Sequence, residues 1–171
     1  MYGRALEDSL GIEELNETIP VIAINRADPC QLGVRRLIEE LDALQLSLYP
    51  AESNHLLDIE TLAQPQMRFV SASVDGEVLG CGGIWLHEDY AEVKRVYVSP
   101  AARGLGLAKK IMARLEDEAR AAGVKIARLE TGIYQPEALG LYRALGYADR
   151  GPFGDYPTGD PMSVFMEKRL A

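Results

Sequence analysis

The stretch of sequence that decides the fold runs from Val93 to Lys110 and reads VKRVYVSPAARGLGLAKK. Its apolar, β-branched start predicts the end of a strand, and Pro100 stops that strand. A long helix follows the glycines at 104 and 106, and the first turn of a helix carries unpaired backbone N–H groups and the positive end of the helix dipole. Because glycine lets the backbone approach an anion closely and Arg103 adds a positive charge, this loop is predicted to hold a pyrophosphate.

Other phosphate-binding loops fit the same stretch less well. A P-loop needs a lysine followed by serine or threonine, but Lys109 and Lys110 follow Ala108 here. A dinucleotide-binding turn needs a third glycine where Lys109 stands, although Glu130 on the next strand resembles the acidic ribose ligand of that motif. A glycine-rich helix start that binds no ligand stays open as an alternative on these residues alone.

Outside this stretch, hydrophobic periodicity and turn residues predict a mixed α/β sheet. Asp75-Gly76 is a strong hairpin signal within an antiparallel meander that ends at Val98. Ser53 is the expected N-cap of a second helix. The predicted strands cover 20–25, 68–74, 78–86, 91–98, 124–130, 147–150 and 163–168, and the predicted helices cover 31–48, 53–63, 104–122 and 137–145. Residues 1–18 are expected to form an arm of unassigned role, and residues 19–171 one domain.

The helix predicted over 104–122 is the most regular element of the sequence. Its apolar positions recur every three or four residues and predict a buried stripe of Ala108, Ile111, Met112, Leu115, Ala119 and Ala122. The opposite side is expected to face water with Lys109, Lys110, Arg114, Glu116 and Asp117. This pattern predicts an amphipathic helix with one buried side and one exposed side.

Length and composition restrict the class of protein. The chain has 171 residues, enough for one domain with its own core, and its formal net charge of -8 disfavours nucleic acid as a partner. No apolar stretch reaches the roughly 20 residues that span a bilayer, and the start does not resemble a signal peptide. Cys30 and Cys81 indicate neither a disulfide framework nor a metal site, so a cytoplasmic protein without a membrane anchor or a bound metal is expected.

Two segments carry a family resemblance that covers nearly everything after Pro20. The residues RGLGLA at 103–108 resemble the R/Q-x-x-G-x-G/A signature of the GNAT superfamily of N-acetyltransferases. The residues QPEALGLYRALGY at 135–147 resemble its second signature, N-x-x-A-x-x-L-Y-x-x-x-G-F, with Gln135 in place of asparagine and Tyr147 in place of phenylalanine. The LETG at 129–132 and the ending SVFMEKRL resemble a subgroup of small bacterial members that includes the YsnE-like proteins.

The resemblance implies a GNAT fold, in which a mixed, mostly antiparallel sheet flanked by helices splays between its fourth and fifth strands. It also implies acetyl-CoA as co-substrate, with its pantetheine arm against the backbone that the splay frees. One backbone N–H there would polarise the thioester carbonyl. The implied contacts are Val96, Tyr97, Val98, Gln135 and Tyr142 along the arm, and Arg103, Gly104, Leu105, Gly106, Leu107 and Ala108 at the pyrophosphate.

The resemblance also suggests catalytic residues, each with a plainer alternative. Tyr142 stands at the general-acid position of the family, although its helical spacing alone fits a core tyrosine. Glu92 and Glu130 compete as the base that takes a proton from the amine, and each also fits a solvated acid at a strand end. His87 is expected on the surface, in a tight turn.

In this family the acceptor site is implied to lie between the first two helices and the loop between the last strands, here residues 48–57 and 151–161. The candidates are Tyr49, Glu52, His55, Asp155 and Tyr156. Three of them carry charge or accept positively charged partners, which suits an amine acceptor, and the loop over 151–161 favours a small molecule over a peptide. A protein lysine or N-terminal acetyltransferase and an acyl-CoA sensor without turnover stay open, and a homodimer is compatible because family members are often dimers.

Overall fold

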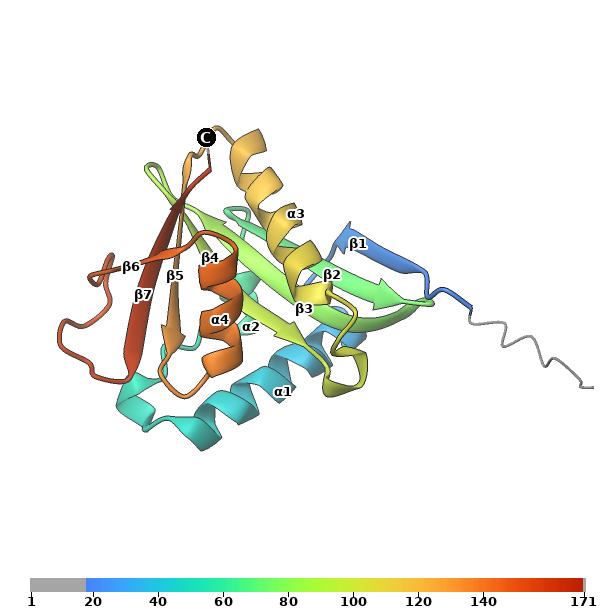
Figure 1. Cartoon of the computed structure of the whole chain (residues 1–171), viewed down its shortest axis with the longest axis horizontal. Helices are drawn as coiled ribbons and strands as arrows, with labels where there is room; N and C mark the ends of the chain where they lie inside the picture. The colour runs from blue at the N-terminus through green and yellow to red at the C-terminus, as the bar shows by residue number, and fades with distance from the viewer. Residues whose placement is uncertain (1–17, 171) are drawn as a thin grey trace, which may run out of the picture.

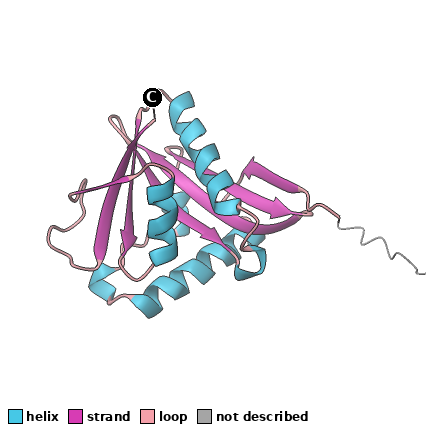
Figure 2. Ribbon diagram, in the orientation of Figure 1, coloured by secondary structure: helices cyan, strands magenta, loops and turns pink. Residues whose placement is uncertain are grey.

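The computed structural model describes residues 18–170, and a seven-stranded sheet forms their centre (Figure 1, Figure 2). The strand order across the sheet is β1-β2-β3-β4-β5-β7-β6. The strands are β1 (Ile22–Arg26), β2 (Met67–Val74), β3 (Glu77–Leu86), β4 (Ala91–Val98), β5 (Ile126–Gly132), β6 (Ala148–Arg150) and β7 (Ser163–Arg169). β4 and β5 run parallel and all other neighbours are antiparallel, which confirms the predicted mixed sheet.

β4 and β5 separate soon after they meet. Within the described chain their pairing is limited to Ala91 with Ala127 and Glu92 with Arg128. Beyond that point β4 stays with β3 and β5 stays with β7, so the two halves of the sheet diverge like the arms of a V (Figure 1). The splay expected between the fourth and fifth strands is therefore confirmed.

Helices cover both faces of the sheet. α3 (Leu107–Ala121) packs on β2, β3 and β4, and α4 (Pro136–Ala144) joins the same core. α1 (Leu32–Leu48) packs on β3 and β4 and shares a smaller core with α2 (Ile59–Leu62). Phe69 and Val70, which are neighbours in β2, belong to different cores because successive side chains of a strand point to opposite faces. No helix among residues 18–170 has the length and apolar character that crossing a membrane requires.

The helix predicted over 53–63 is wrong over its first half. Ala51–Ser53 form a 3-10 turn, and the following residues up to Asp58 are not helical. Asp58 rather than Ser53 is the N-cap, since its carboxylate accepts a hydrogen bond from the Thr61 N–H at 2.7 Å. Of the predicted arm over residues 1–18, all but Thr18 lie outside the described residues.

The long helix begins at Leu107 rather than at Gly104. A 3-10 turn over Pro100–Ala102 precedes it, and Gly104 and Gly106 then adopt φ angles of 86° and 73°. These left-handed conformations are strained for residues with a side chain, so the two glycines shape a loop and not a helical turn. Ala122, expected in the buried stripe, is the exposed C-cap of the helix.

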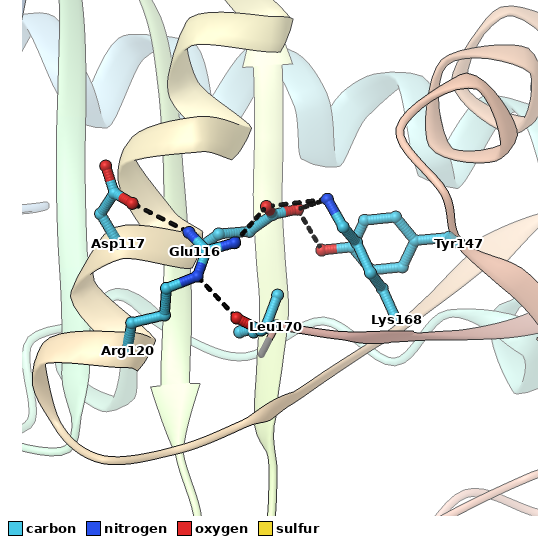
Figure 3. Close-up of polar contacts among 6 residues, drawn as sticks. All are labelled: Glu116, Asp117, Arg120, Tyr147, Lys168 and Leu170. Atoms are coloured by element: carbon cyan, nitrogen blue, oxygen red, sulfur yellow. Dashed lines mark hydrogen bonds and ion pairs between the residues drawn. The ribbon is translucent and has the colours of Figure 1, made fainter.

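Glu116 corrects the predicted water-facing side of α3, because its side chain is buried. It accepts hydrogen bonds from the Tyr147 hydroxyl at 3.1 Å and from the Lys168 amine at 2.9 and 3.0 Å (Figure 3). Arg120 adds an ion pair at 3.6 Å, and its guanidinium also donates to the Leu170 carbonyl. The hydroxyl of Tyr147, where the family signature has phenylalanine, therefore has a buried structural partner.

Candidate active site

The splay between β4 and β5 opens a cleft at the centre of the molecule. The cleft is lined by Val96 from β4 and Glu130 from β5. It is also lined by Gln135, the N-cap of α4, and by Tyr142 within α4. The acceptor candidates Tyr49, His55 and Tyr156 line the same cleft. The structure thus brings together residues that are far apart in the sequence.

A groove of about 710 Å³ continues from the cleft to the start of α3. Val96, Gln135 and Tyr142 line both the cleft and the groove. The groove is also lined by Tyr97, Val98, Arg103, Gly104, Gly106, Leu107 and Ala108. Among the predicted coenzyme contacts, Leu105 alone lies outside this lining, and its side chain is partly exposed.

The start of α3 fits the pyrophosphate of coenzyme A. Gly106 is the N-cap and contributes no side-chain hydrogen bond, so N–H groups of the first turn are available to an anion. Arg103 is exposed and lies 4.0 Å from Glu137, which is a loose pair that leaves the guanidinium accessible. In the part of the chain that the structure describes, no group of three or more His, Cys, Asp or Glu side chains could hold a metal ion.

Tyr142 is a buried side chain that reaches both the cleft and the groove. Burial raises the pKa of its hydroxyl to about 12, and the nearby Glu130 carboxyl adds to the rise. The hydroxyl therefore keeps its proton at neutral pH, as a proton donor must.

The two candidate bases lie in different surroundings. Glu130 lines the cleft with Tyr142 and accepts a hydrogen bond from Ser163 Oγ at 2.9 Å, and burial raises the pKa of its carboxyl. Glu92 is buried rather than solvated, and it lines a neighbouring cavity instead of the cleft. Its carboxylate accepts a hydrogen bond from the Tyr156 hydroxyl at 3.0 Å and pairs with Lys94 at 3.1 Å.

Tyr49 ties the end of α1 to the start of α4 at the rim of the cleft. Its hydroxyl donates to Gln135 Oε1 at 3.2 Å and accepts from the Tyr134 N–H at 3.1 Å. Gln135 Oε1 also accepts from Gln45 Nε2 at 3.3 Å. Gln135, which is longer than the asparagine of the signature, is therefore held by Gln45 of α1 and by Tyr49, the residue that follows α1.

The remaining acceptor candidates are divided between the cleft and its surroundings. His55 lies in the non-helical segment before α2, not in a helix, and its ring meets the Tyr156 ring edge-on with centroids 5.2 Å apart. Glu52 is exposed on the 3-10 turn and lines neither the cleft nor the groove. Asp155 is exposed beside the neighbouring cavity. His87 is exposed as predicted.

Sequence reasoning missed Arg95, which shapes β4 beside the cleft. It has a φ of 55°, and the register between β3 and β4 shifts at the same place, which marks a β-bulge. Its buried guanidinium pairs with Asp42 at 3.1 Å and donates to the Leu57 carbonyl at 2.8 Å. The available signal was the pair of adjacent charged residues Lys94-Arg95, which interrupts the alternation of apolar and polar residues along β4.

Comparison with known proteins identifies similar chains. Residues 35–147 match the family model described as "Acetyltransferase (GNAT) family". The chain is 53% identical over 154 residues to the IAA acetyltransferase of Azospirillum brasilense, covering 89% of this chain and 100% of that protein. It is 36% identical over 136 residues to the uncharacterized N-acetyltransferase YsnE of Bacillus subtilis, covering 77% and 88%. A solved structure from Klebsiella pneumoniae, a "putative acyl-CoA N-acyltransferase", matches with a TM-score of 0.74 and 38% identity over 88% of this chain and 98% of that one.

Proposed function

The chain belongs to the GNAT family of acetyltransferases, and on this premise we propose that it moves the acetyl group of acetyl-CoA to the primary amine of a small molecule. Family membership makes the chain an N-acyltransferase. The observation that carries the finer proposal is that Glu130 and Tyr142 line one cleft, which continues into the groove along the glycine-rich loop.

The groove supports a division of labour in binding the co-substrate. Acetyl-CoA supplies the acetyl group as a thioester when it is bound. Arg103 and the N–H groups at the start of α3 would hold its pyrophosphate, and the backbone of 96–98 would hold its pantetheine arm. One N–H of this stretch would stabilise the negative charge that develops on the carbonyl oxygen.

The two titratable groups of the cleft suit opposite proton transfers. An ammonium must lose a proton before its nitrogen can attack, and Glu130 is the proposed base because burial raises its affinity for that proton. Tyr142 is the proposed acid, which gives its proton to the sulfur as the C–N bond forms and the C–S bond breaks. After the attack the nitrogen loses a second proton, and an amide and a free thiol leave. One of the two protons lost by the nitrogen restores Tyr142, and the other is released to solvent.

A small acceptor is supported by the loop over 151–161. Ser53 Oγ donates to Asp160 at 3.1 Å and the His55 ring meets Tyr156, so this loop lies against the segment that follows α1. A site enclosed in this way suits a metabolite better than an extended peptide. The Azospirillum relative is also named for IAA rather than for a protein.

The test is calorimetry with acetyl-CoA, with NADH as the control ligand, followed by thiol release across a panel of amines. Binding of acetyl-CoA alone together with thiol release is expected. Tyr142→Phe should lower kcat by roughly 10²-fold or more while the Kd of acetyl-CoA stays nearly unchanged, since only the proton is removed. Absence of acetyl-CoA binding would overturn the proposal, and binding without release for any amine would favour a sensor.

A further inference from the structure

A second cavity of about 670 Å³ lies beside the cleft. We call it the aromatic chamber because its lining includes the rings of Trp85, His87, Tyr90, Phe153 and Tyr156. Its volume falls within the roughly 300–1,000 Å³ typical of small-molecule sites. The proposed mechanism uses none of these rings, so the chamber requires an explanation of its own.

The rings of the chamber form one continuous wall. His87 stacks on Tyr90 with centroids 4.4 Å apart, Tyr90 meets Phe153 edge-on at 5.5 Å, and Phe153 meets Tyr156 edge-on at 5.3 Å. Two of the rings follow β3 and two come from the loop over 151–161. Such edge-to-face contacts hold the rings in place before any ligand arrives. The chamber is therefore a preformed aromatic surface.

The chamber adjoins the cleft through a shared wall. Both cavities are lined by Asn54, His55, Leu56, Lys94 and Tyr156. Tyr142 and Glu130 line the cleft but not the chamber. A molecule that occupies both spaces would thus have one end at the proposed acid and base and its other end among the rings.

Two cations beside the chamber, Lys94 and Arg128, already have carboxylate partners within the protein. Lys94 lies 5.0 Å from the centre of the Tyr156 ring and pairs with Glu92, the buried carboxylate of the chamber, at 3.1 Å. Arg128 lies over the Tyr90 ring at 4.4 Å and pairs with Glu167 at 2.7 Å. Since protein cations already occupy these ring faces, an ammonium group gains little there, and an uncharged aromatic ring is the better occupant.

Resting on the proposed acetyl transfer to an amine, we propose that the acceptor is an arylalkylamine, whose aromatic ring binds in the aromatic chamber and whose amino group reaches the cleft. Lys94 and Tyr156 line both cavities, so they would contact the acceptor where its ring joins the amine-bearing chain. The ring contacts give specificity, and the amine enters the acetyl transfer already described.

The test compares 2-phenylethylamine with 2-cyclohexylethylamine, two primary amines with the same carbon skeleton that differ in aromaticity. Ring contacts of the kind seen in the chamber predict a kcat/KM about tenfold higher for the phenyl compound. Phe153→Leu should bring the ratio of the two kcat/KM values close to one while leaving the KM of acetyl-CoA nearly unchanged, because Phe153 does not line the groove. Thermal melting of the variant checks that it is folded.

A second readout needs neither a variant nor turnover. Trp85 is the single tryptophan of the chain and lines the chamber, so its fluorescence can report on a ligand that binds there. We expect 2-phenylethylamine to quench or shift the Trp85 fluorescence in a saturable way, and its cyclohexyl analogue to change it little. Equal acetylation of the two amines with no tryptophan response would overturn the aromatic acceptor while the acetyltransferase function stands. Absence of thiol release from every amine of the wider panel would overturn the proposed function and this inference with it.

Discussion

At the scale of single residues, the proposed role of Glu130 as the base predicts how the reaction should depend on pH. A base must be deprotonated, and burial raises the pKa of Glu130, so kcat/KM should fall as the pH drops through that raised value. Glu130→Gln should remove this acidic limb and lower kcat/KM by roughly 10²–10⁴-fold. The pKa of Tyr142, at about 12, predicts no matching alkaline limb near neutral pH.

The measurement is the pH–rate profile of thiol release for the wild type, Glu130→Gln and Glu92→Gln. Glu92 serves as the matched control because it is a second buried glutamate that lines the neighbouring cavity. Loss of the acidic limb in Glu92→Gln, with the limb intact in Glu130→Gln, would reassign the base to Glu92.

Gly132 is a single residue on which the rim of the cleft depends. A Cβ at this position would lie 1.9 Å from the Tyr49 hydroxyl oxygen, so Gly132→Ala must displace the Tyr49 ring and its hydrogen bonds to Gln135 and Tyr134. We expect the free energy of unfolding to drop by about 1–3 kcal/mol, as overpacked cores do. Urea unfolding measures it.

Gly140→Ala is the matched control for this substitution. Gly140 lies within α4, where a Cβ would meet no atom within 4 Å. The same change there should raise the free energy of unfolding by about 1 kcal/mol, because alanine loses less backbone entropy in a helix. Equal effects at both positions would show that Tyr49 does not constrain Gly132.

At the scale of elements, Glu116 connects α3 to β7 and to the end of α4. Tyr147→Phe removes one of its hydrogen bonds and leaves Lys168 and Arg120 in place, so the free energy of unfolding should fall by about 1 kcal/mol. Lys168→Met removes a charged donor, so it should lower the free energy of unfolding by more, about 2–3 kcal/mol. Chemical denaturation of both variants ranks the two losses, and the reverse order would contradict the contact geometry.

Elements with a clear hydrophobic period could be predicted from the sequence. α1, α3 and the meander of β2, β3 and β4 lie within a few residues of their predicted bounds, because periodicity and turn residues specify them locally. The predicted helix over 53–63 failed because Ser53 and Asp58 are both good N-caps, and packing of the segment against the loop over 151–161 favours the later one.

The candidate site was predictable only where a signature marks it. The glycine-rich loop and Tyr142 were found in this way, and the groove and the cleft bring them together. Arg95 and Glu116 were missed because local pattern places charged residues on the surface, whereas each is paired in the interior with a residue distant in the sequence. The aromatic chamber was missed because its rings come from segments that are far apart in the sequence.

At the scale of the whole molecule, the two arms of the V-shaped sheet carry different parts of the candidate site. One arm, β1 to β4, presents the start of α3 and the bulged edge of β4, and the other, β5 to β7, presents Glu130. α4 joins the core beneath α3 through Tyr142 and lies beside the gap between the diverging strands β4 and β5 (Figure 1). A ligand in the groove and cleft therefore touches both arms, and its binding energy should appear in the stability of the whole chain.

Acetyl-CoA should accordingly raise the free energy of unfolding by about 2.7 kcal/mol at a concentration of 100 times its Kd, because it binds the folded chain alone. Thermal melting in increasing acetyl-CoA measures this as a rise in Tm. Arg103→Gln should reduce the rise at low ionic strength and have little effect in high salt, since an exposed charge is screened. Arg36→Gln makes the same charge change at an exposed position outside the groove and should leave the rise intact. Equal losses for the two variants would mean that net charge, and not the glycine-rich loop, attracts the co-substrate.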